Sequence, residues 1–78
     1  MIKIKYYGFL KKFMPEISDD GFWYADKANK TIEELFVETN VDYKNIRMTI
    51  LVNSSRKDTS YVLKENDVIT VMPLVAGG

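Results

Sequence analysis

The sequence predicts a small α+β domain built from several strands and one main helix. Two observations carry this prediction. Apolar and polar residues alternate with a period of two in segments near both ends of the chain, which is the spacing of strands with one buried face. A single segment near the middle combines a helix-start motif with apolar residues at helical spacing. The predicted order of elements is strand, strand, helix, strand, short strand, strand.

The composition limits the chemistry that side chains can perform. The 78 residues include no cysteine and no histidine, which excludes disulfides, thiolate nucleophiles, Cys/His zinc sites and imidazole acid–base catalysis. Hydrophobic residues make up 46% and charged residues 28%, as in ordinary globular domains, so one compact core is expected. We expect this chain to bind no metal and no cofactor of its own.

Charge and hydropathy bear on partners and location. The 11 basic residues balance the 11 acidic ones, whereas a nucleic-acid-binding domain usually carries a basic excess. No apolar run approaches the roughly 18 residues of a membrane span, and residues 1–5 alternate instead of forming the apolar stretch of a signal peptide. The sequence therefore predicts a cytoplasmic protein that contacts neither nucleic acid nor membrane.

The first half of the chain contains two predicted strands. Residues 2–6 form the first, with apolar side chains at the even-numbered positions facing the core. Gly8 ends it, and residues 9–14 have the apolar spacing of one or two helical turns. Turn-forming residues at 18–21 precede an aromatic segment, residues 22–25. That segment is compatible with a second strand, and its sequence leaves open which side chains are buried.

The main helix is predicted from its first turn. Thr31 and Glu34 match a capping box, in which each side chain accepts a hydrogen bond from the other's backbone N–H. The helix should begin at Ile32, and Asn40 is a plausible stop.

The second half is predicted to contain three strands. Residues 48–53 form the third main strand and residues 53–58 a polar loop. Residues 61–63 are a short strand, residues 64–67 a tight turn, and residues 68–72 the last strand.

Several short motifs occur in one order along nearly the whole chain. They are Met1-Ile2-Lys3-Ile4, Tyr7-Gly8-Phe9-Leu10, Thr31-Ile32-Glu33-Glu34-Leu35, Val52-Asn53, Leu63-Lys64-Glu65-Asn66-Asp67-Val68 and Met72-Pro73-Leu74-Val75-Ala76-Gly77-Gly78. Together they resemble the MoaD/ThiS family of ubiquitin-like sulfur carriers, and most closely MoaD, the small subunit of molybdopterin synthase. ThiS, the sulfur carrier of thiazole synthesis, shares the helix start, the asparagine, the acidic turn and the diglycine.

The resemblance implies the β-grasp (ubiquitin-like) fold, in which one main helix lies across a mixed sheet of four to five strands. Some features of the sequence resemble ThiS more closely, and others resemble MoaD. The stretch from Thr31 to Asn53 is nearer the length found in ThiS, whereas residues 8–10 and Pro73 favour MoaD. Asn66 stands where the family commonly has glycine, and asparagine can replace glycine at positive φ.

The resemblance also implies the chemistry. The carboxylate of Gly78 would be adenylated by a ubiquitin-activating-like (MoeB/ThiF-type) enzyme that uses ATP and magnesium, and sulfur would replace AMP to give a thiocarboxylate. The thiocarboxylate would then serve a larger synthase subunit (MoaE-type) in molybdopterin synthesis, or a thiazole synthase. The residues agree with a carrier and not an enzyme, because a chain without cysteine or histidine has little with which to activate a carboxylate.

The predicted domain is residues 1–73, followed by a mobile tail, residues 74–78. Glycine has no Cβ, so the terminal diglycine can lie extended in a channel too narrow for other residues. Five residues beyond Pro73 reach at most about 17 Å. The residues expected to enter a partner's active site ahead of Gly78 are Pro73, Leu74, Val75, Ala76 and Gly77. The alternative for Leu74 and Val75 is a frayed strand end that packs on the body.

Strand parity predicts a docking surface. If Ile69 faces the core, then Met72 faces outward on the last strand, and Leu51 does so on the neighbouring strand. Lys3 and Lys5 should lie on the same face, one strand away. An exposed apolar patch beside the tail marks a surface for a protein partner, although isolated exposed apolar residues are also common. The free protein is expected to be a monomer.

Three functions remain beside the molybdopterin assignment. The first is the same sulfur chemistry in thiamine thiazole synthesis. The second is a ubiquitin-like modifier that forms isopeptide bonds with lysines through the same adenylate. The third is a non-covalent β-grasp binding module whose diglycine is incidental.

Overall fold

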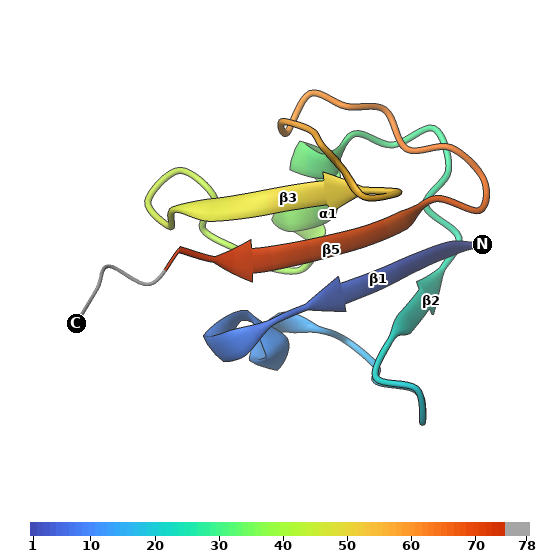
Figure 1. Cartoon of the computed structure of the whole chain (residues 1–78), viewed down its shortest axis with the longest axis horizontal. Helices are drawn as coiled ribbons and strands as arrows, with labels where there is room; N and C mark the ends of the chain where they lie inside the picture. The colour runs from blue at the N-terminus through green and yellow to red at the C-terminus, as the bar shows by residue number, and fades with distance from the viewer. Residues whose placement is uncertain (75–78) are drawn as a thin grey trace.

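The computed structural model describes residues 1–74 as a mixed five-stranded sheet with one main helix (Figure 1). The elements in chain order are β1 (Ile2–Tyr6), the 3-10 helix η1 (Gly8–Phe13), β2 (Trp23–Ala25), α1 (Ile32–Glu38), β3 (Met48–Val52), β4 (Ser55–Arg56) and β5 (Val68–Pro73). The strand order is β2-β1-β5-β3-β4, in which β1 and β5 run parallel and all other neighbours run antiparallel. The predicted β-grasp fold is confirmed.

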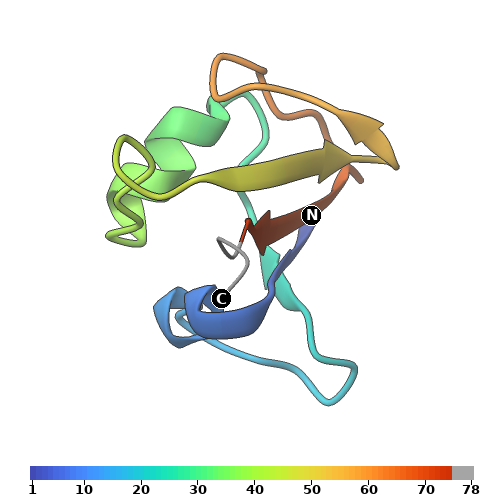
Figure 2. The ribbon, with the colours of Figure 1, turned by 60° about the vertical axis from the view of Figure 1, so that its left-hand side comes forward.

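The core lies between the sheet and α1. Alternate side chains of β1 and β5 point into it, as the period of two predicted. Figure 2 shows α1 against one side of the sheet, and we call the opposite side the outer face. The buried hydrophobic residues are Ile2, Ile4, Tyr6, Leu10, Met14, Trp23, Ala25, Ile32, Leu35, Phe36, Val41, Ile50, Val52, Leu63, Ile69 and Val71.

A buried hydrogen bond joins the first strand to the end of the helix. The hydroxyl groups of Tyr6 and Thr39 lie 2.9 Å apart, and the Thr39 hydroxyl also donates to the carbonyl of Leu35 at 3.0 Å. Burial is the main reason why the pKa of Tyr6 is raised to about 12. The tyrosine therefore stays neutral and its polar tip is satisfied inside the core.

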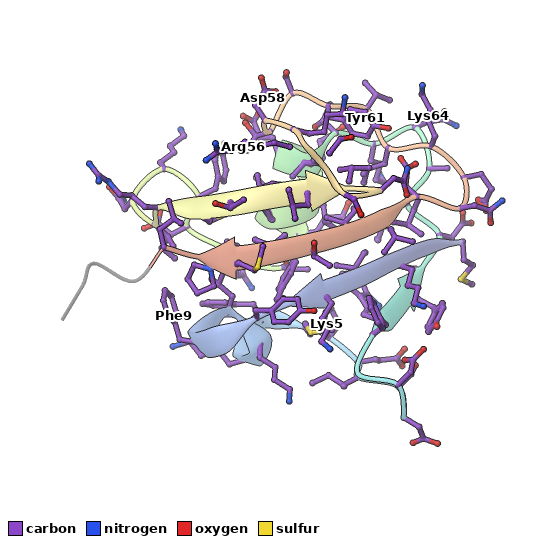
Figure 3. All side chains as sticks on the ribbon, in the orientation of Figure 1. Lys5, Phe9, Arg56, Asp58, Tyr61 and Lys64 are labelled. Atoms are coloured by element: carbon purple, nitrogen blue, oxygen red, sulfur yellow. The ribbon has the colours of Figure 1, made fainter. Side chains whose placement is uncertain are left out.

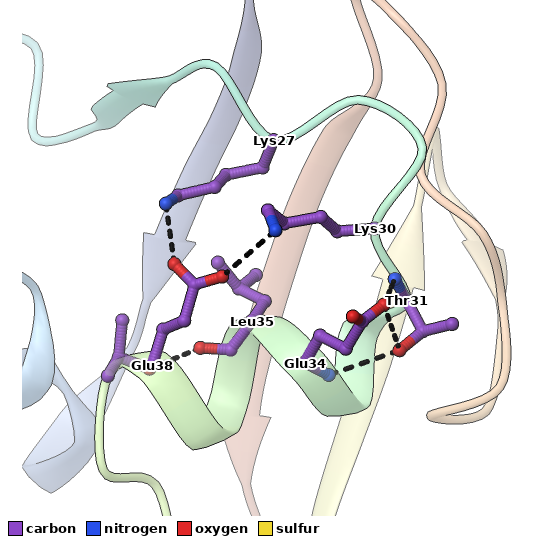
Figure 4. Close-up of polar contacts among 7 residues, drawn as sticks. Lys27, Lys30, Thr31, Glu34, Leu35 and Glu38 are labelled. Atoms are coloured by element: carbon purple, nitrogen blue, oxygen red, sulfur yellow. Dashed lines mark hydrogen bonds and ion pairs between the residues drawn. The ribbon is translucent and has the colours of Figure 1, made fainter.

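The helix begins as its first turn predicted (Figure 4). The backbone N–H of Glu34 donates to the Thr31 hydroxyl at 3.1 Å, and the Glu34 carboxylate accepts from the Thr31 N–H at 2.9 Å. These hydrogen bonds to Thr31 hold the pKa of Glu34 below its ordinary value. At the other end Asn40 takes a positive φ of 63°, and Glu38 pairs with Lys27 at 2.5 Å.

The prediction of a short strand at residues 61–63 is wrong. The short strand is β4, which lies in the predicted polar loop and pairs with the end of β3. Asn53 and Ser54 both take positive φ, 52° and 70°, and so close a two-residue hairpin between the strands. Residues 61–63 make only one isolated bridge, from Val62 to Thr31, because Leu63 exchanges backbone hydrogen bonds with the segment before α1.

A polar network fixes the turn before β5. The Asp67 carboxylate accepts from the Asn53 amide at 2.8 Å, the Lys64 backbone N–H at 2.8 Å and the Tyr61 hydroxyl at 3.0 Å. Burial is the largest single effect and favours the neutral acid, but the hydrogen bonds to the carboxylate outweigh it and hold the pKa of Asp67 below its ordinary value. Asn66 takes φ of 70°, so its prediction as a glycine substitute at positive φ is confirmed.

Candidate functional site

The last strand ends where the predicted tail begins. β5 runs to Pro73, which pairs with Met48 at the start of β3. One residue later, the backbone N–H of Leu74 donates to the carbonyl of Arg47 at 2.9 Å, although its side chain is half exposed. This hydrogen bond continues the pairing with the segment before β3 as far as Leu74, and the domain boundary at residue 73 stays a prediction. The predictions for residues 75–78 lie outside the described residues.

A glycine makes room for the end of β5. Gly8 opens η1 with a φ of 58°, a conformation that side chains with a Cβ rarely adopt. A Cβ atom at this position would lie 3.1 Å from the Cγ atom of Pro73 and 3.6 Å from its Cδ atom. The proline ring thus packs on bare backbone on one side, while strand pairing and the Leu74–Arg47 bond hold the chain on the other. The point where the chain leaves the sheet is fixed from both sides.

The predicted apolar patch lies on the outer face. Leu51 of β3 and Met72 of β5 are on neighbouring strands, and neither side chain faces the helix. They are diagonal neighbours, because Leu51 pairs with Thr70 and Met72 pairs with Thr49. Both are half-buried and not fully exposed. The patch is therefore a pair of apolar side chains set among threonines, close to the end of β5.

Both predicted lysines lie on the same face, one strand away. Lys5 is the register partner of Thr70, and Lys3 that of Val68. Their ammonium groups rest on aromatic rings: the Nζ atom of Lys3 lies 4.3 Å and that of Lys5 5.2 Å from the centroid of Phe22. These are cation–π distances, so the ring holds both charges on the outer face.

Two tyrosines complete this arrangement. The Nζ atom of Lys5 also lies 4.9 Å from the ring of Tyr7, and that of Lys3 lies 5.9 Å from the ring of Tyr24. Trp23, between Phe22 and Tyr24, is buried instead. This settles which side chains the second strand presents: its tryptophan faces the core and Tyr24 is exposed.

Asp20 holds the aromatic pair in place. Its carboxylate accepts from the backbone N–H of Phe22 at 3.0 Å and from the hydroxyl of Tyr24. The hydrogen bond from Tyr24 is the main reason why the pKa of Asp20 lies below its ordinary value, and the same bond raises the pKa of the Tyr24 hydroxyl. The carboxylate is thus engaged with the strand that carries the rings.

Sequence reasoning placed the lysines correctly but missed their aromatic partners. In the sequence, η1 and a loop separate Phe22 from β1, and the antiparallel pairing of β1 with β2 brings Phe22 beside Lys3 and Lys5. The signal that could have found Phe22 is strand alternation. Once Trp23 is assigned to the core, its neighbours Phe22 and Tyr24 must face the other side of the sheet.

The described residues hold neither a group of metal-binding side chains nor a membrane-spanning helix. Residues 1–74 contain no group of three or more acidic side chains placed to hold a metal ion. Within the same range, none of the helices has the length and apolar character needed to cross a bilayer. The expected absence of bound metal, cofactor and nucleic acid, the monomeric state and the cytoplasmic location stay predictions.

Comparison with known proteins identifies the family. Residues 4–78 match the model of the ThiS family. The chain belongs to that family. None of the curated proteins matches it. ThiS-family proteins are non-catalytic sulfur carriers, so the prediction of a carrier and not an enzyme is confirmed, as is the wider MoaD/ThiS assignment. The match gives no support to the preference for MoaD, and it fits thiamine synthesis at least as well as molybdopterin synthesis.

Proposed function

We propose that this ThiS-family carrier bears sulfur on Gly78 and delivers it for the thiazole ring of thiamine. The observation that carries the proposal is the family match, which extends to residue 78 and so includes the diglycine. The composition supports it, because a chain without cysteine or histidine is suited to being activated by another protein. The length from Thr31 to Asn53 favours the same pathway.

The chemistry takes place on the last carbonyl carbon. A free C-terminal carboxyl has a pKa of about 3.3 to 3.7, so at neutral pH it is an anion that resists nucleophiles. ThiS-family carriers are generally adenylated by ThiF/MoeB-type enzymes. In the proposed reaction the Gly78 carboxylate attacks the α-phosphate of ATP and releases pyrophosphate, with magnesium held by the enzyme. A hydrosulfide ion supplied through the partner then attacks the carbonyl carbon and displaces AMP, and loss of the thiol proton leaves a thiocarboxylate.

The fixed exit of the chain from the sheet gives this carrier its geometry. Pro73 is held between Gly8 and the pairing with Met48, and Leu74 is tied to Arg47. The remaining residues, 75–78, can span at most about 14 Å when extended. We propose that the outer face docks on the partner through Leu51 and Met72 while residues 75–78 reach into the partner's active site.

Molybdopterin synthesis is the second candidate, and one contact favours it. The segment at residues 8–10 and Pro73 are the features that resemble MoaD, and Pro73 packs directly on Gly8. In this pathway the thiocarboxylate would serve a larger MoaE-type synthase subunit instead of a thiazole synthase.

Mass spectrometry of the protein purified from its native cell tests the carrier proposal. A species in which sulfur replaces one oxygen, located on the C-terminal peptide, is expected. Gly-Gly remnants on lysines of other proteins would favour a covalent modifier instead, and the lasting absence of both would favour a binding module. Reconstitution with thiazole synthase and, separately, with the molybdopterin synthase large subunit separates the two pathways: only the true partner should yield a sulfur-containing product.

A variant that lacks only Gly78 is the control for both the mass spectrometry and the reconstitution. The truncated chain should unfold at the same urea concentration as the full chain and form no thiocarboxylate. Full sulfur transfer after the deletion would contradict the proposal.

A further inference from the structure

Five side chains at one edge of the outer face form what we call the lysine–aromatic cluster: Lys3, Lys5, Tyr7, Phe22 and Tyr24. Both ammonium groups lie within 5.5 Å of the same Phe22 ring, and each also lies within 6 Å of a tyrosine ring. Clusters of this kind keep two like charges close together on an exposed surface, which costs free energy unless something attracts both. The rings supply part of that attraction through their quadrupoles.

The charges themselves are not neutralised within the described residues. The ion pairs among residues 1–74 join Met1 to Glu65 and join Lys27 and Lys30 to Glu38, so neither Lys3 nor Lys5 has a carboxylate within 4.0 Å. Asp20, whose charge acts on Lys3 from a distance, directs its oxygens to Tyr24 and Phe22. The cluster therefore presents two positive charges that still lack anionic partners.

The positions of these charges are fixed by the fold. Gly21, at φ of 87°, leaves space for Lys5, whose Nζ atom would lie only 3.3 Å from a Cβ at that position. The two lysines point to the same side of β1 because they are two residues apart in a strand. Their Cα atoms are therefore separated by about 7 Å, which is twice the rise per residue.

The two ammonium groups on one ring define the anion that would fit. Acidic residues at alternate positions of a strand, or one turn apart on a helix, present two carboxylates on the same side of their element. A polyanion such as nucleic acid fits less well, because the chain has no net charge and the Asp20 carboxylate adjoins the cluster. The complementary surface is a discrete acidic pair on a protein.

We propose that the lysine–aromatic cluster binds a pair of neighbouring carboxylates on the activating enzyme. This inference rests on the proposed function and adds the chemistry of the partner's surface to it. The cluster lies on the same face as the Leu51–Met72 patch, across β5 from Leu51. An apolar contact and a charged contact on two different strands fix the rotation of the carrier on its partner, which neither contact does alone.

The test measures adenylation, which precedes the branch between thiazole and molybdopterin synthesis. The ThiF/MoeB-type enzyme from the same genome is assayed by ATP–pyrophosphate exchange with the full chain as substrate. In one variant, Lys3→Met and Lys5→Met remove both charges and keep most of each aliphatic stem. The matched control, Lys57→Met with Lys64→Met, removes the same charge from loops at the opposite side of the molecule; Lys57 also rests on a ring, 5.4 Å from the centroid of Tyr61. In Figure 3, Tyr61 and Lys64 lie beyond β3, far from Lys5.

The cluster variant should raise the KM for the carrier about fivefold at low salt, since exposed ion pairs are each worth about 0.2–1 kcal/mol. The increase should shrink to less than about twofold at 0.5 M salt because the contact is screened. The control should stay within about 1.5-fold of the wild type at each salt concentration. Phe22→Leu keeps both charges but removes the ring that places them, and should raise KM about twofold.

Each other outcome has a distinct meaning. If the wild-type chain is adenylated and the cluster variant matches the control at low salt, the inference is overturned and the proposed function stands. If the wild-type chain is not adenylated, the proposed function itself is overturned. If sedimentation shows a wild-type dimer at low salt that the cluster variant loses, the cluster binds a second copy and not the enzyme. Unchanged urea unfolding of the variants would establish that any effect on KM is not a loss of fold.

Discussion

Replacement of Gly8 by alanine tests whether the chain leaves the sheet at a fixed point. Gly8 has φ of 58°, and a Cβ there would lie 3.1 Å from Cγ of Pro73. The left-handed conformation costs an alanine about 1–2 kcal/mol. Against this, alanine lowers the entropy of the unfolded chain, which stabilises the fold by roughly 0.4–1 kcal/mol. The expected net loss is about 1 kcal/mol, before any displacement of Pro73.

Urea unfolding followed by tryptophan fluorescence measures this loss. Trp23 is the only tryptophan and is 7% exposed, so its emission reports the loss of the core. With an m-value of about 1 kcal/mol/M for so small a domain, Gly8→Ala should lower the midpoint by about 1 M.

Gly8→Asn is the matched control, because asparagine carries the same Cβ but tolerates positive φ better. If the backbone dihedral causes the loss, the asparagine variant should be the more stable of the two. Equal losses would assign the whole effect to the contact with Pro73. A Gly8→Ala variant as stable as the wild type would refute the reasoning altogether.

Three further predictions concern the cap, the polar network and the docking face. Thr31→Ala should lower the free energy of unfolding by about 1 kcal/mol, and Thr31→Ser should restore most of it, because the serine hydroxyl can accept the same N–H. Asp67→Asn should destabilise the domain at pH 7. The pKa of Asp67 is lowered in the folded state, so its stabilisation is present above the ordinary carboxyl pKa and is lost as the pH falls through the folded-state value. Urea midpoints of wild type and variant should therefore draw together as the pH falls below the ordinary carboxyl pKa, and a constant difference would contradict the charged network. Met72→Asp should raise the KM for adenylation with little change in the urea midpoint, whereas unfolding of this variant would show that Met72 belongs to the core.

Much of the fold could be predicted because local signals agreed with the final packing. The alternation in residues 2–6 and 68–72 identified the inward side chains of β1 and β5 correctly. The capping box located the first residue of α1 because both of its hydrogen bonds form between residues three apart. Signals of this kind need no knowledge of distant contacts.

The predictions were wrong or incomplete where contacts between residues far apart in the sequence determine the structure. Residues 61–63 have the composition of a strand, yet Leu63 pairs with the backbone before α1, and the edge of β3 is taken by β4. The hairpin that places β4 there depends on Asn53 and Ser54 at positive φ, which polar composition alone does not reveal. Likewise, the candidate site was predicted as four residues on β1, β3 and β5, whereas the ring that holds its lysines belongs to Phe22, directly before β2.

The central position of β5 has a consequence for how the chain is made. β5 lies between β1 and β3, yet it is the last of the five strands to leave the ribosome. Until it emerges, β1 and β3 have no common neighbour and the apolar side of the sheet cannot close over the helix. Folding is therefore postponed until β5 has been synthesised, so a chain that stops short of β5 lacks a closed core.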